Sequence, residues 1–138
     1  LQILCSGTPT PSDVRWGSAY ALKMGNEWFM FDCGPAATYK LIKSKINPLD
    51  ISNLFFTHHH SDHDADYACF LLTRFDQSIV KEKELNVYGP PPTKELTNKL
   101  LAKMTVHTGM ISLQELITHE VCGLIRNEEE NYPDQSQK

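Results

Sequence analysis

Four histidines and an aspartate lie close together in residues 57–63, which read Thr-His-His-His-Ser-Asp-His. Imidazole nitrogens and carboxylate oxygens are usual protein ligands of Zn²⁺, and they also bind Mn²⁺ and Fe. In an extended segment, residues two apart point to the same side, so His58 and His60 can bind one ion together while His59 points the other way. Asp62 and His63 follow where the chain turns into a helix, within reach of a second ion. The segment therefore predicts a site for one or two metal ions.

The metal-binding segment follows a short apolar strand that we predict over residues 54–56. Sheets in α/β proteins place their active sites just beyond the carboxyl ends of central strands. The segment is also internal and is interrupted by Ser61 and Asp62, which argues against an expression tag. Its position therefore favours a functional site.

Strand and helix patterns alternate along the chain and predict an α/β layer architecture. A Gly-Asn pair at 25–26 between two apolar runs indicates a hairpin. The expected strands cover residues 1–5, 19–24, 28–31, 54–56 and 85–88, and the expected helices cover 35–46, a stretch capped by Ser61 or Asp62, and 93–104.

Helical spacing of apolar residues predicts which helix faces are buried. For the helix over 35–46, with Pro35 in its first turn, the expected buried residues are Tyr39, Leu41, Ile42 and Ile46. For the helix after the histidines, they are Ala65, Cys69, Leu72 and Phe75, and Phe70 is also interpreted as a packing residue.

The last part of the chain is harder to interpret. Residues 112–117 fit either a helix that begins with a capping box or a strand, and both alternatives stay open. From residue 126 onward the chain is polar, so we expect a domain over 1–125 and a flexible tail over 126–138.

Charge and composition narrow the function classes. The net charge of −4 and the pI near 5.8 do not support nucleic-acid binding, and the basic spot at Lys40, Lys43 and Lys45 is interpreted as a solvated helix face. No apolar run approaches the ~20 residues of a membrane span. The four cysteines form no CxxC pair, which favours a reducing compartment, and hence the cytoplasm.

Several motifs resemble one protein family. His58-x-His60-x-Asp62-His63 after an apolar strand resembles the signature of the metallo-β-lactamase superfamily. Residues 6–11 (Ser-Gly-Thr-x-x-Pro) and 31–34 (Phe-Asp-Cys-Gly) are similar to motifs of its ribonuclease Z and phosphodiesterase-like branch, and residues 87–90 (Val-Tyr-Gly-Pro) also fit this branch. The similarity extends from Leu1 to about Leu101.

The resemblance implies an αββα sandwich, of which this chain supplies mainly the first βα half. It assigns His58 and His60 to a first ion, and Asp62 and His63 to a second. It also implies that Asp32 supports the metal site without touching an ion. Asp62 is in addition a candidate for proton transfer, although metal binding is its main expected role.

The complete site of the family has three more ligands, two histidines and a bridging aspartate. No motif for them is recognisable. Only His107 and His119 remain as histidines after the motif, and Asp76 and Asp134 do not fit the bridging role well. Whether the chain has enzyme activity therefore stays open at this point, because catalytic zinc usually has three protein ligands.

These observations predict a metal-dependent hydrolase, with zinc as the expected metal and Mn²⁺ or Fe as alternatives. Its expected substrate is a phosphodiester or related ester in a small molecule or nucleotide. The alternative is a truncated, non-catalytic module that binds metal or self-assembles. A redox diiron protein of the same fold is disfavoured by His60, because that branch typically has glutamate there. Half a sandwich would expose an apolar sheet face, so we also expect a homo-oligomer.

Overall fold

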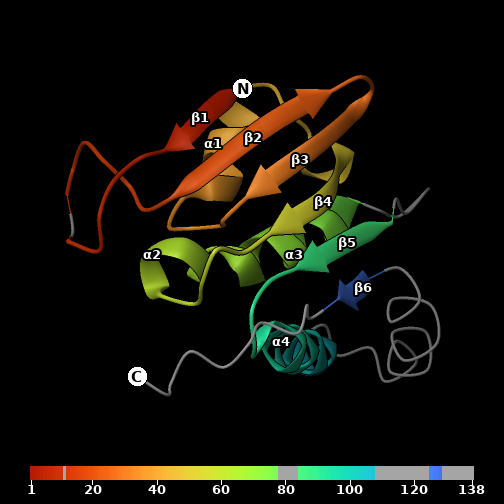
Figure 1. Ribbon diagram of the computed structural model, residues 1–138. Helices are drawn as coiled ribbons and strands as arrows, with labels where there is room; N and C mark the ends of the chain where they lie inside the picture. Colours follow the sequence, from red (N-terminus) through yellow and green to blue (C-terminus); the bar gives the residue numbers. More distant parts are fainter. Residues whose placement is uncertain (11, 78–83, 108–124, 129–138) are drawn as a thin grey trace, which may run out of the picture.

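The computed structural model describes residues 1–10, 12–77, 84–107 and 125–128, with the main chain alone for 103–107 and 125–128. These residues form one six-stranded sheet and its helices (Figure 1). The strands are β1 (Gln2–Cys5), β2 (Ala19–Met24), β3 (Glu27–Phe31), β4 (Ile51–Phe55), β5 (Leu85–Tyr88) and β6 (Ile125–Glu128). The helices are α1 (Ala37–Lys43), the 3₁₀ turn η1 (Pro48–Asp50), α2 (Ser61–Asp64), α3 (Tyr67–Gln77) and α4 (Thr93–His107).

The strand order is the sequence order, and the sheet is mixed. β1, β2 and β3 pair antiparallel, whereas β3, β4, β5 and β6 pair parallel. The β2–β3 hairpin turns at Gly25, whose φ of +59° is readily adopted by glycine. Since parallel strands run in one direction, the carboxyl ends of β3, β4 and β5 meet at one edge of the sheet. Phe31 pairs with Phe55, and Phe55 pairs with Tyr88 at that edge.

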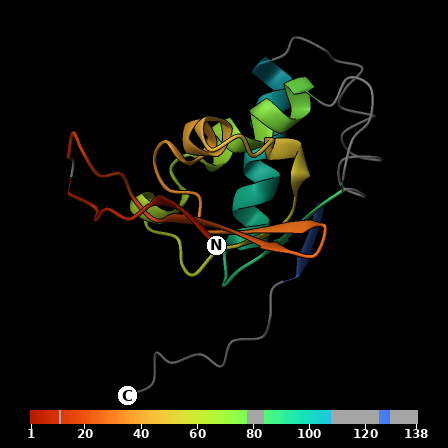
Figure 2. The ribbon, with the colours of Figure 1, turned by 90° about the horizontal axis from the view of Figure 1, so that it is seen from above.

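Helices α1, α3 and α4 lie on one face of the sheet (Figure 2). Alternate strand residues point to that face, so Met30, Leu54 and Val87 are fully buried against the helices. Leu41 from α1 and Phe70 from α3 complete the core from the helical layer. The core is therefore a two-layer βα structure.

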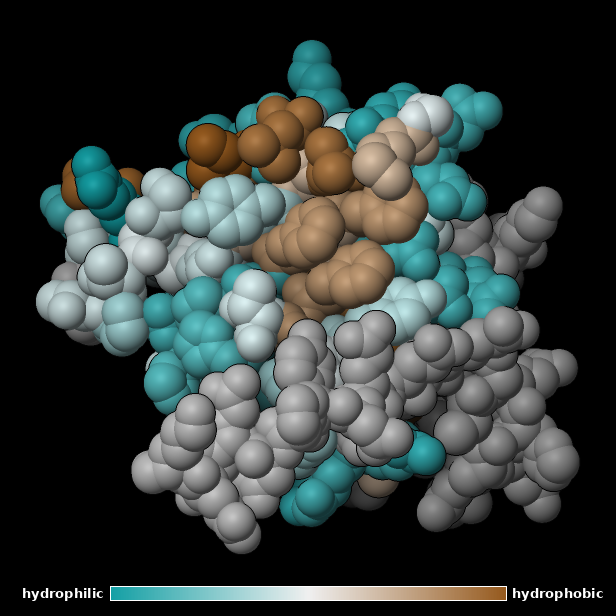
Figure 3. All heavy atoms as spheres, in the orientation of Figure 1, coloured by the Kyte–Doolittle hydropathy of each residue, from teal (hydrophilic) through white to brown (hydrophobic). Residues whose placement is uncertain are grey.

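The opposite face of the sheet carries a row of aromatic side chains. Phe31 and Phe55 stack with ring centroids 5.3 Å apart, and Phe55 and Tyr88 stack at 4.6 Å. Phe29 extends the row at 6.5 Å from Phe55. All four side chains are half-buried, and Figure 3 shows apolar side chains gathered on this face. This row is called the aromatic row below.

Most expected elements are present, with different ends. The strands at 19–24 and 85–88 and the hairpin are confirmed. The helix expected over 35–46 is shorter, because Ala36 has a left-handed φ of +65° before α1 and Lys45 has one of +59° after it. β4 begins earlier than expected, at Ile51, and the helix after the histidines is divided into α2 and α3.

Two predicted buried faces are partly wrong. In α1, Leu41 is buried, but Tyr39 and Ile42 are 60% and 51% exposed. The division of the next helix shifts its apolar face, so that Cys69 is exposed. The residues of α3 that are buried instead are Tyr67, Phe70, Leu71 and Arg74.

Arg74 is buried because it fastens α3 to the turn before β4. Its guanidinium donates to the carbonyl oxygens of Pro48 at 2.5 Å and Ile51 at 2.8 Å. Periodicity of apolar residues gives no signal for a buried arginine, so this member of the buried face of α3 was not predicted.

Part of the segment expected as a tail lies in the sheet, because β6 includes residues 126–128 and pairs with β5. Residues 112–117 and 129–138 lie outside the described part of the chain, so the alternatives for 112–117 remain untested. None of the described helices combines the length and the apolar character that a membrane span requires.

Candidate metal centre

The histidine segment lies at the carboxyl edge of the sheet. β4 ends at Phe55, the amide of Phe56 still bonds to the carbonyl of Tyr88 at 2.8 Å, and residues 57–60 then leave the sheet. His60 is extended (φ −98°, ψ 153°) and precedes the first residue of α2. The segment therefore lies at the ends of neighbouring parallel strands, as predicted from its position after an apolar strand.

Asp32 organises this edge. It follows β3, is 2% exposed and has a φ of +58°, which turns the chain sharply. One carboxylate oxygen accepts hydrogen bonds from the Thr57 amide at 2.8 Å and hydroxyl at 3.0 Å. The other lies 2.7 Å from Nδ1 of His63 and 3.3 Å from the Ser18 hydroxyl. One buried carboxylate thus holds both ends of the histidine segment, Thr57 and His63.

The imidazole of His63 is oriented by this contact. A carboxylate only accepts hydrogen bonds, so Nδ1 of His63 carries the hydrogen and a neutral ring presents a lone pair at Nε2. That nitrogen lies 3.3 Å from a carboxylate oxygen of Asp62. Metal-binding histidines typically donate their second nitrogen to a carboxylate in this way.

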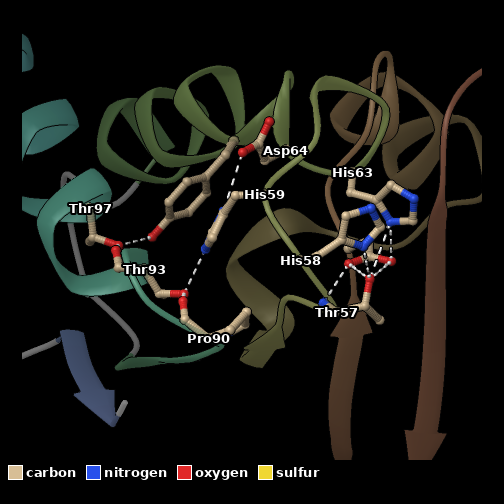
Figure 4. A network of polar contacts seen from close by, with 10 residues as sticks. Thr57, His58, His59, His63, Asp64, Pro90, Thr93 and Thr97 are labelled. Carbon is tan, nitrogen blue, oxygen red and sulfur yellow. Dashed lines mark hydrogen bonds and ion pairs between the residues drawn. The ribbon is translucent and has the colours of Figure 1, made fainter. Parts of the chain in front are cut away.

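The other two predicted ligands lie beside His63. The ring of His58 is 4.0 Å from that of His63 and 4.6 Å from that of His60, centroid to centroid. Nδ1 of His58 contacts the Thr57 hydroxyl at 3.1 Å (Figure 4). The structure therefore brings His58, His60, Asp62 and His63 together.

These side chains are of the types that bind cations, although in this structure they do not surround a single ion position. Within the described part of the chain, no three His, Cys, Asp or Glu side chains are arranged to hold a common ion. However, Oδ1 of Asp62 is buried without a hydrogen-bond partner, and a buried unpaired carboxylate oxygen is costly. In a neutral ring, the lone pair on Nε2 of His63 faces the other oxygen of Asp62. A positive charge between these atoms would stabilise both.

Backbone contacts clamp α2 against the end of β3. The amide of Ser18 donates to the carbonyl of Asp62 at 2.7 Å, and the amide of Cys33 donates to the carbonyl of His63 at 2.6 Å. A Cβ at Gly34 would lie 2.1 Å from the Asp62 carbonyl oxygen, and one at Gly17 would lie 2.2 Å from it. Glycine is thus required at both positions by close approach of the backbone.

Nearby cysteine thiols are not nucleophiles here. Burial raises the pKa of Cys33 well above its ordinary value, and the neighbouring Asp66 raises it further. Burial also raises the pKa of Cys5. Both thiols are free and protonated near neutral pH, so they act as packing groups beneath the site.

Among the other residues weighed as ligands, Asp76 is not brought to this group. Asp76 is exposed in the last turn of α3, at the far end of that helix from α2. His107 is the last residue of α4. His119 and Asp134 lie outside the described residues. Thr57 and Ser18 were not predicted as supporting residues, because a single hydroxyl beside a motif gives no sequence signal.

Fold and site together define an α/β protein with a group of metal-type ligands at the carboxyl edge of its parallel strands. The sequence profile of the metallo-beta-lactamase superfamily matches residues 13–129, and the chain belongs to this superfamily. The expected fold class is confirmed: the chain supplies a βα half of the αββα sandwich.

The chain is similar to ribonuclease Z proteins over part of their length. It is 39% identical over 98 residues to ribonuclease Z of Lactococcus lactis subsp. cremoris MG1363, which covers 69% of this chain and 32% of the relative. It is 32% identical over 133 residues to ribonuclease Z of Methanocaldococcus jannaschii, covering 96% and 41%. The crystal structure of the short form of human tRNase Z superposes with a TM-score of 0.65 at 29% identity, covering 78% and 39%. The chain thus spans well under half the length of these relatives.

Proposed function

We propose that this chain carries the metal-binding half of a metal-dependent hydrolase that cleaves phosphodiester bonds in RNA. The observation that carries the proposal is the convergence of His58, His60, Asp62 and His63 beside a buried, unpaired oxygen of Asp62. We assign His58 and His60 to one ion, and Asp62 and His63 to a second. Zinc fits these nitrogen and oxygen ligands, with Mn²⁺ or Fe as alternatives.

Residues of this chain prepare the ligands before any ion binds. Asp32 holds His63 with Nε2 toward Asp62, and Thr57 contacts Nδ1 of His58. Such partners orient ligands and increase metal affinity. When bound, the ions supply Lewis-acid chemistry, which activates water and neutralises negative charge in the transition state. The candidate role of Asp62 in proton transfer needs the same free oxygen, Oδ1, so we assign this atom to metal binding first.

RNA is the proposed substrate because the chain is similar to two proteins named ribonuclease Z over 69% and 96% of its length. The acidic net charge pointed instead to a small-molecule or nucleotide ester. Charge of one part of a protein is a weak guide to its substrate, since the surface that grips RNA can lie elsewhere. Free thiols at Cys5, Cys33 and Cys69 support a reducing compartment, and we propose the cytoplasm.

Hydrolysis of labelled, structured RNA by the Zn²⁺- or Mn²⁺-loaded chain tests this proposal, with bis(p-nitrophenyl) phosphate as a small phosphodiester. We expect RNA cleavage that EDTA abolishes and that the double variant His58→Ala, His60→Ala lacks. Cleavage of the small ester alone would support the small-molecule alternative. Absence of turnover by a chain that demonstrably binds metal would contradict catalysis by this chain alone and favour the non-catalytic module described next.

A second candidate is a module that binds metal and self-assembles without turnover. It is favoured by the observation that no three donors surround one point within the described residues. It is also favoured by the aromatic row, since α1, α3 and α4 cover only the other sheet face (Figure 2). We propose that a second copy of the chain packs on this row, because contiguous apolar surface of this kind typically marks an interface.

A further inference from the structure

His59 lies on the opposite side of the histidine segment from the proposed ligands, where it contacts two other elements (Figure 4). Its Nδ1 is 3.2 Å from a carboxylate oxygen of Asp64 in α2, and its Nε2 is 2.7 Å from the hydroxyl of Thr93 at the start of α4. The side chain of His59 is 11% exposed. A histidine held at both nitrogens in a nearly closed environment has a fixed orientation.

The contact with α4 is made by the hydroxyl of Thr93. This hydroxyl donates to the carbonyl of Pro90 at 2.6 Å and lies 2.7 Å from Nε2 of His59, so it joins the histidine segment to the start of α4. In the next turn, Thr97 donates its hydrogen to the carbonyl of Thr93 at 2.8 Å, so the buried hydroxyl of Tyr67 donates to Thr97 at 3.0 Å. Thr97 thus contacts the main chain of Thr93 and not the hydroxyl that meets His59, so its side chain lies outside the contacts of His59.

The residues packed around the His59 ring include a glycine that leaves room for its contact with Thr93. Phe56 lies against His59 with ring centroids 5.1 Å apart. A Cβ at Gly89 would lie 2.5 Å from the Thr93 hydroxyl oxygen and 3.0 Å from Cβ of Phe56. Any larger residue at 89 would displace one of the two groups that hold His59. The turn between β5 and α4 therefore needs a glycine at position 89 for Thr93 and Phe56 to contact His59 as they do.

We propose that His59 is a positioning residue that sets the orientation of His58 and His60 by clamping their loop to α2 and α4. This inference rests on the proposed metal centre. Because neighbouring residues of an extended segment point to opposite sides, fixing the His59 ring fixes the rotation of the segment. The rings of His58 and His60 are then held on the ligand side, 4.6 Å apart. Precise support of this kind determines whether ligands meet an ion at the required geometry.

Calorimetric titration of Zn²⁺ into chelator-stripped chain tests the clamp, at a temperature where circular dichroism shows each variant folded. His59→Leu and Thr93→Val should each weaken binding about 10- to 100-fold, the usual effect of removing a group that supports a metal ligand. His59→Gln and Thr93→Ser retain the bond between residues 59 and 93 and should recover most of the affinity. Thr97→Val removes a buried hydroxyl of α4 outside the clamp and should leave affinity unchanged.

The outcomes separate this inference from the proposed function. Equal Zn²⁺ affinity in the natural chain and in His59→Leu would overturn the clamp and leave the metal centre intact. If the natural chain and the double variant His58→Ala, His60→Ala both bind no Zn²⁺, the metal centre fails. Imidazole NMR signals of His58 and His60 in the metal-free chain still decide the clamp in that case. They should shift and broaden in His59→Leu but not in Thr97→Val, and unchanged signals would overturn it.

Discussion

Asp32 determines the local geometry of the site at the residue scale, because its single carboxylate contacts Thr57, His63 and Ser18. Asp32→Asn keeps the size of the side chain, and asparagine tolerates the positive φ at this position. Its amide group, however, donates where Asp32 only accepts, so Thr57 or His63 loses a partner.

We expect Asp32→Asn to lower the free energy of unfolding by about 1–3 kcal/mol and metal affinity by about 10- to 100-fold. Urea unfolding and calorimetric Zn²⁺ titration measure the two effects. Asp13→Asn, at an exposed aspartate, is the control and should change neither. A fully retained Zn²⁺ affinity in Asp32→Asn would show that Asp32 does not orient the ligands.

Buried acidic groups predict a loss of stability at alkaline pH. Burial raises the pKa of Cys33 and of Tyr67 above their ordinary values. A raised pKa in the folded state means that the stabilisation is complete below the unfolded pKa, near 8.5 for Cys and 10 for Tyr. It is lost as the pH rises above these values, by at most about 1.4 kcal/mol per pH unit for each group.

Urea unfolding of the natural chain at pH 7.5 and pH 10 measures this loss. The loss should be smaller in Cys33→Ala, which removes one of the buried acidic groups, and unchanged in Cys69→Ala, where the thiol is exposed. A loss in Cys33→Ala as large as in the natural chain would assign the alkaline sensitivity to other groups.

At the scale of elements, the site depends on three segments that meet at the carbonyl of Asp62. The first segment is the loop before β2, the second is the turn after β3, and the third is α2. The amide of Ser18 bonds to this carbonyl, and Gly17 and Gly34 allow the backbones to approach it closely because they have no side chain. A methyl group at Gly34 would lie 2.1 Å from this carbonyl and 2.8 Å from the backbone of Ser18. Both neighbours are main-chain atoms, so neither can move by a rotamer change.

Gly34→Ala should therefore lower the free energy of unfolding by about 3 kcal/mol or more and weaken metal binding at the same time. Thermal unfolding followed by circular dichroism is the measurement. Gly25→Asn is a suitable control, because the hairpin turn is open around Gly25 and asparagine tolerates its positive φ. A melting temperature of Gly34→Ala close to that of the control would contradict the close approach.

Elements were predictable where one physical signal dominated. The strands at 19–24 and 85–88 combine apolar runs with clear turn residues, and the metal-binding segment carries its own spacing signal. The ends of α1 and the break between α2 and α3 were missed. The ends of α1 depend on positive φ values at Ala36 and Lys45. The break between α2 and α3 coincides with tertiary contacts of Asp66, which bonds to Cys33 and to Thr38. Neither feature has a local signature.

At the scale of the whole molecule, the sheet has one face covered by helices and one face with the aromatic row. Phe55 lies at the centre of the row, 5.3 Å from Phe31 and 4.6 Å from Tyr88. The sequence predicted this open face only through the family resemblance, since alternation along β3 and β4 does not reveal what covers the second side.

If a second copy packs on the row, sedimentation velocity at micromolar concentration should show a dimer. Phe55→Lys should shift it to monomer, because a charged side chain at the centre of the interface would be desolvated without a partner. Ile42→Lys makes a matched change at an exposed apolar residue of α1 and should leave the dimer intact. A monodisperse monomer in the natural chain would contradict self-association.

The four proposed ligands could be named from the sequence because they occur in one short motif. The remaining ligands that the family resemblance implies have no such motif in this sequence. A site assembled from distant segments depends on tertiary structure, which spacing alone does not encode.

Metal content per chain is the most direct test of the central claim, that His58, His60, Asp62 and His63 form a metal centre. Inductively coupled plasma mass spectrometry should compare the purified natural chain with the double variant His58→Ala, His60→Ala. The account predicts one or about two zinc, manganese or iron ions per natural chain and a clear loss in the variant. Near-zero metal in both proteins, or equal metal in both, would contradict it.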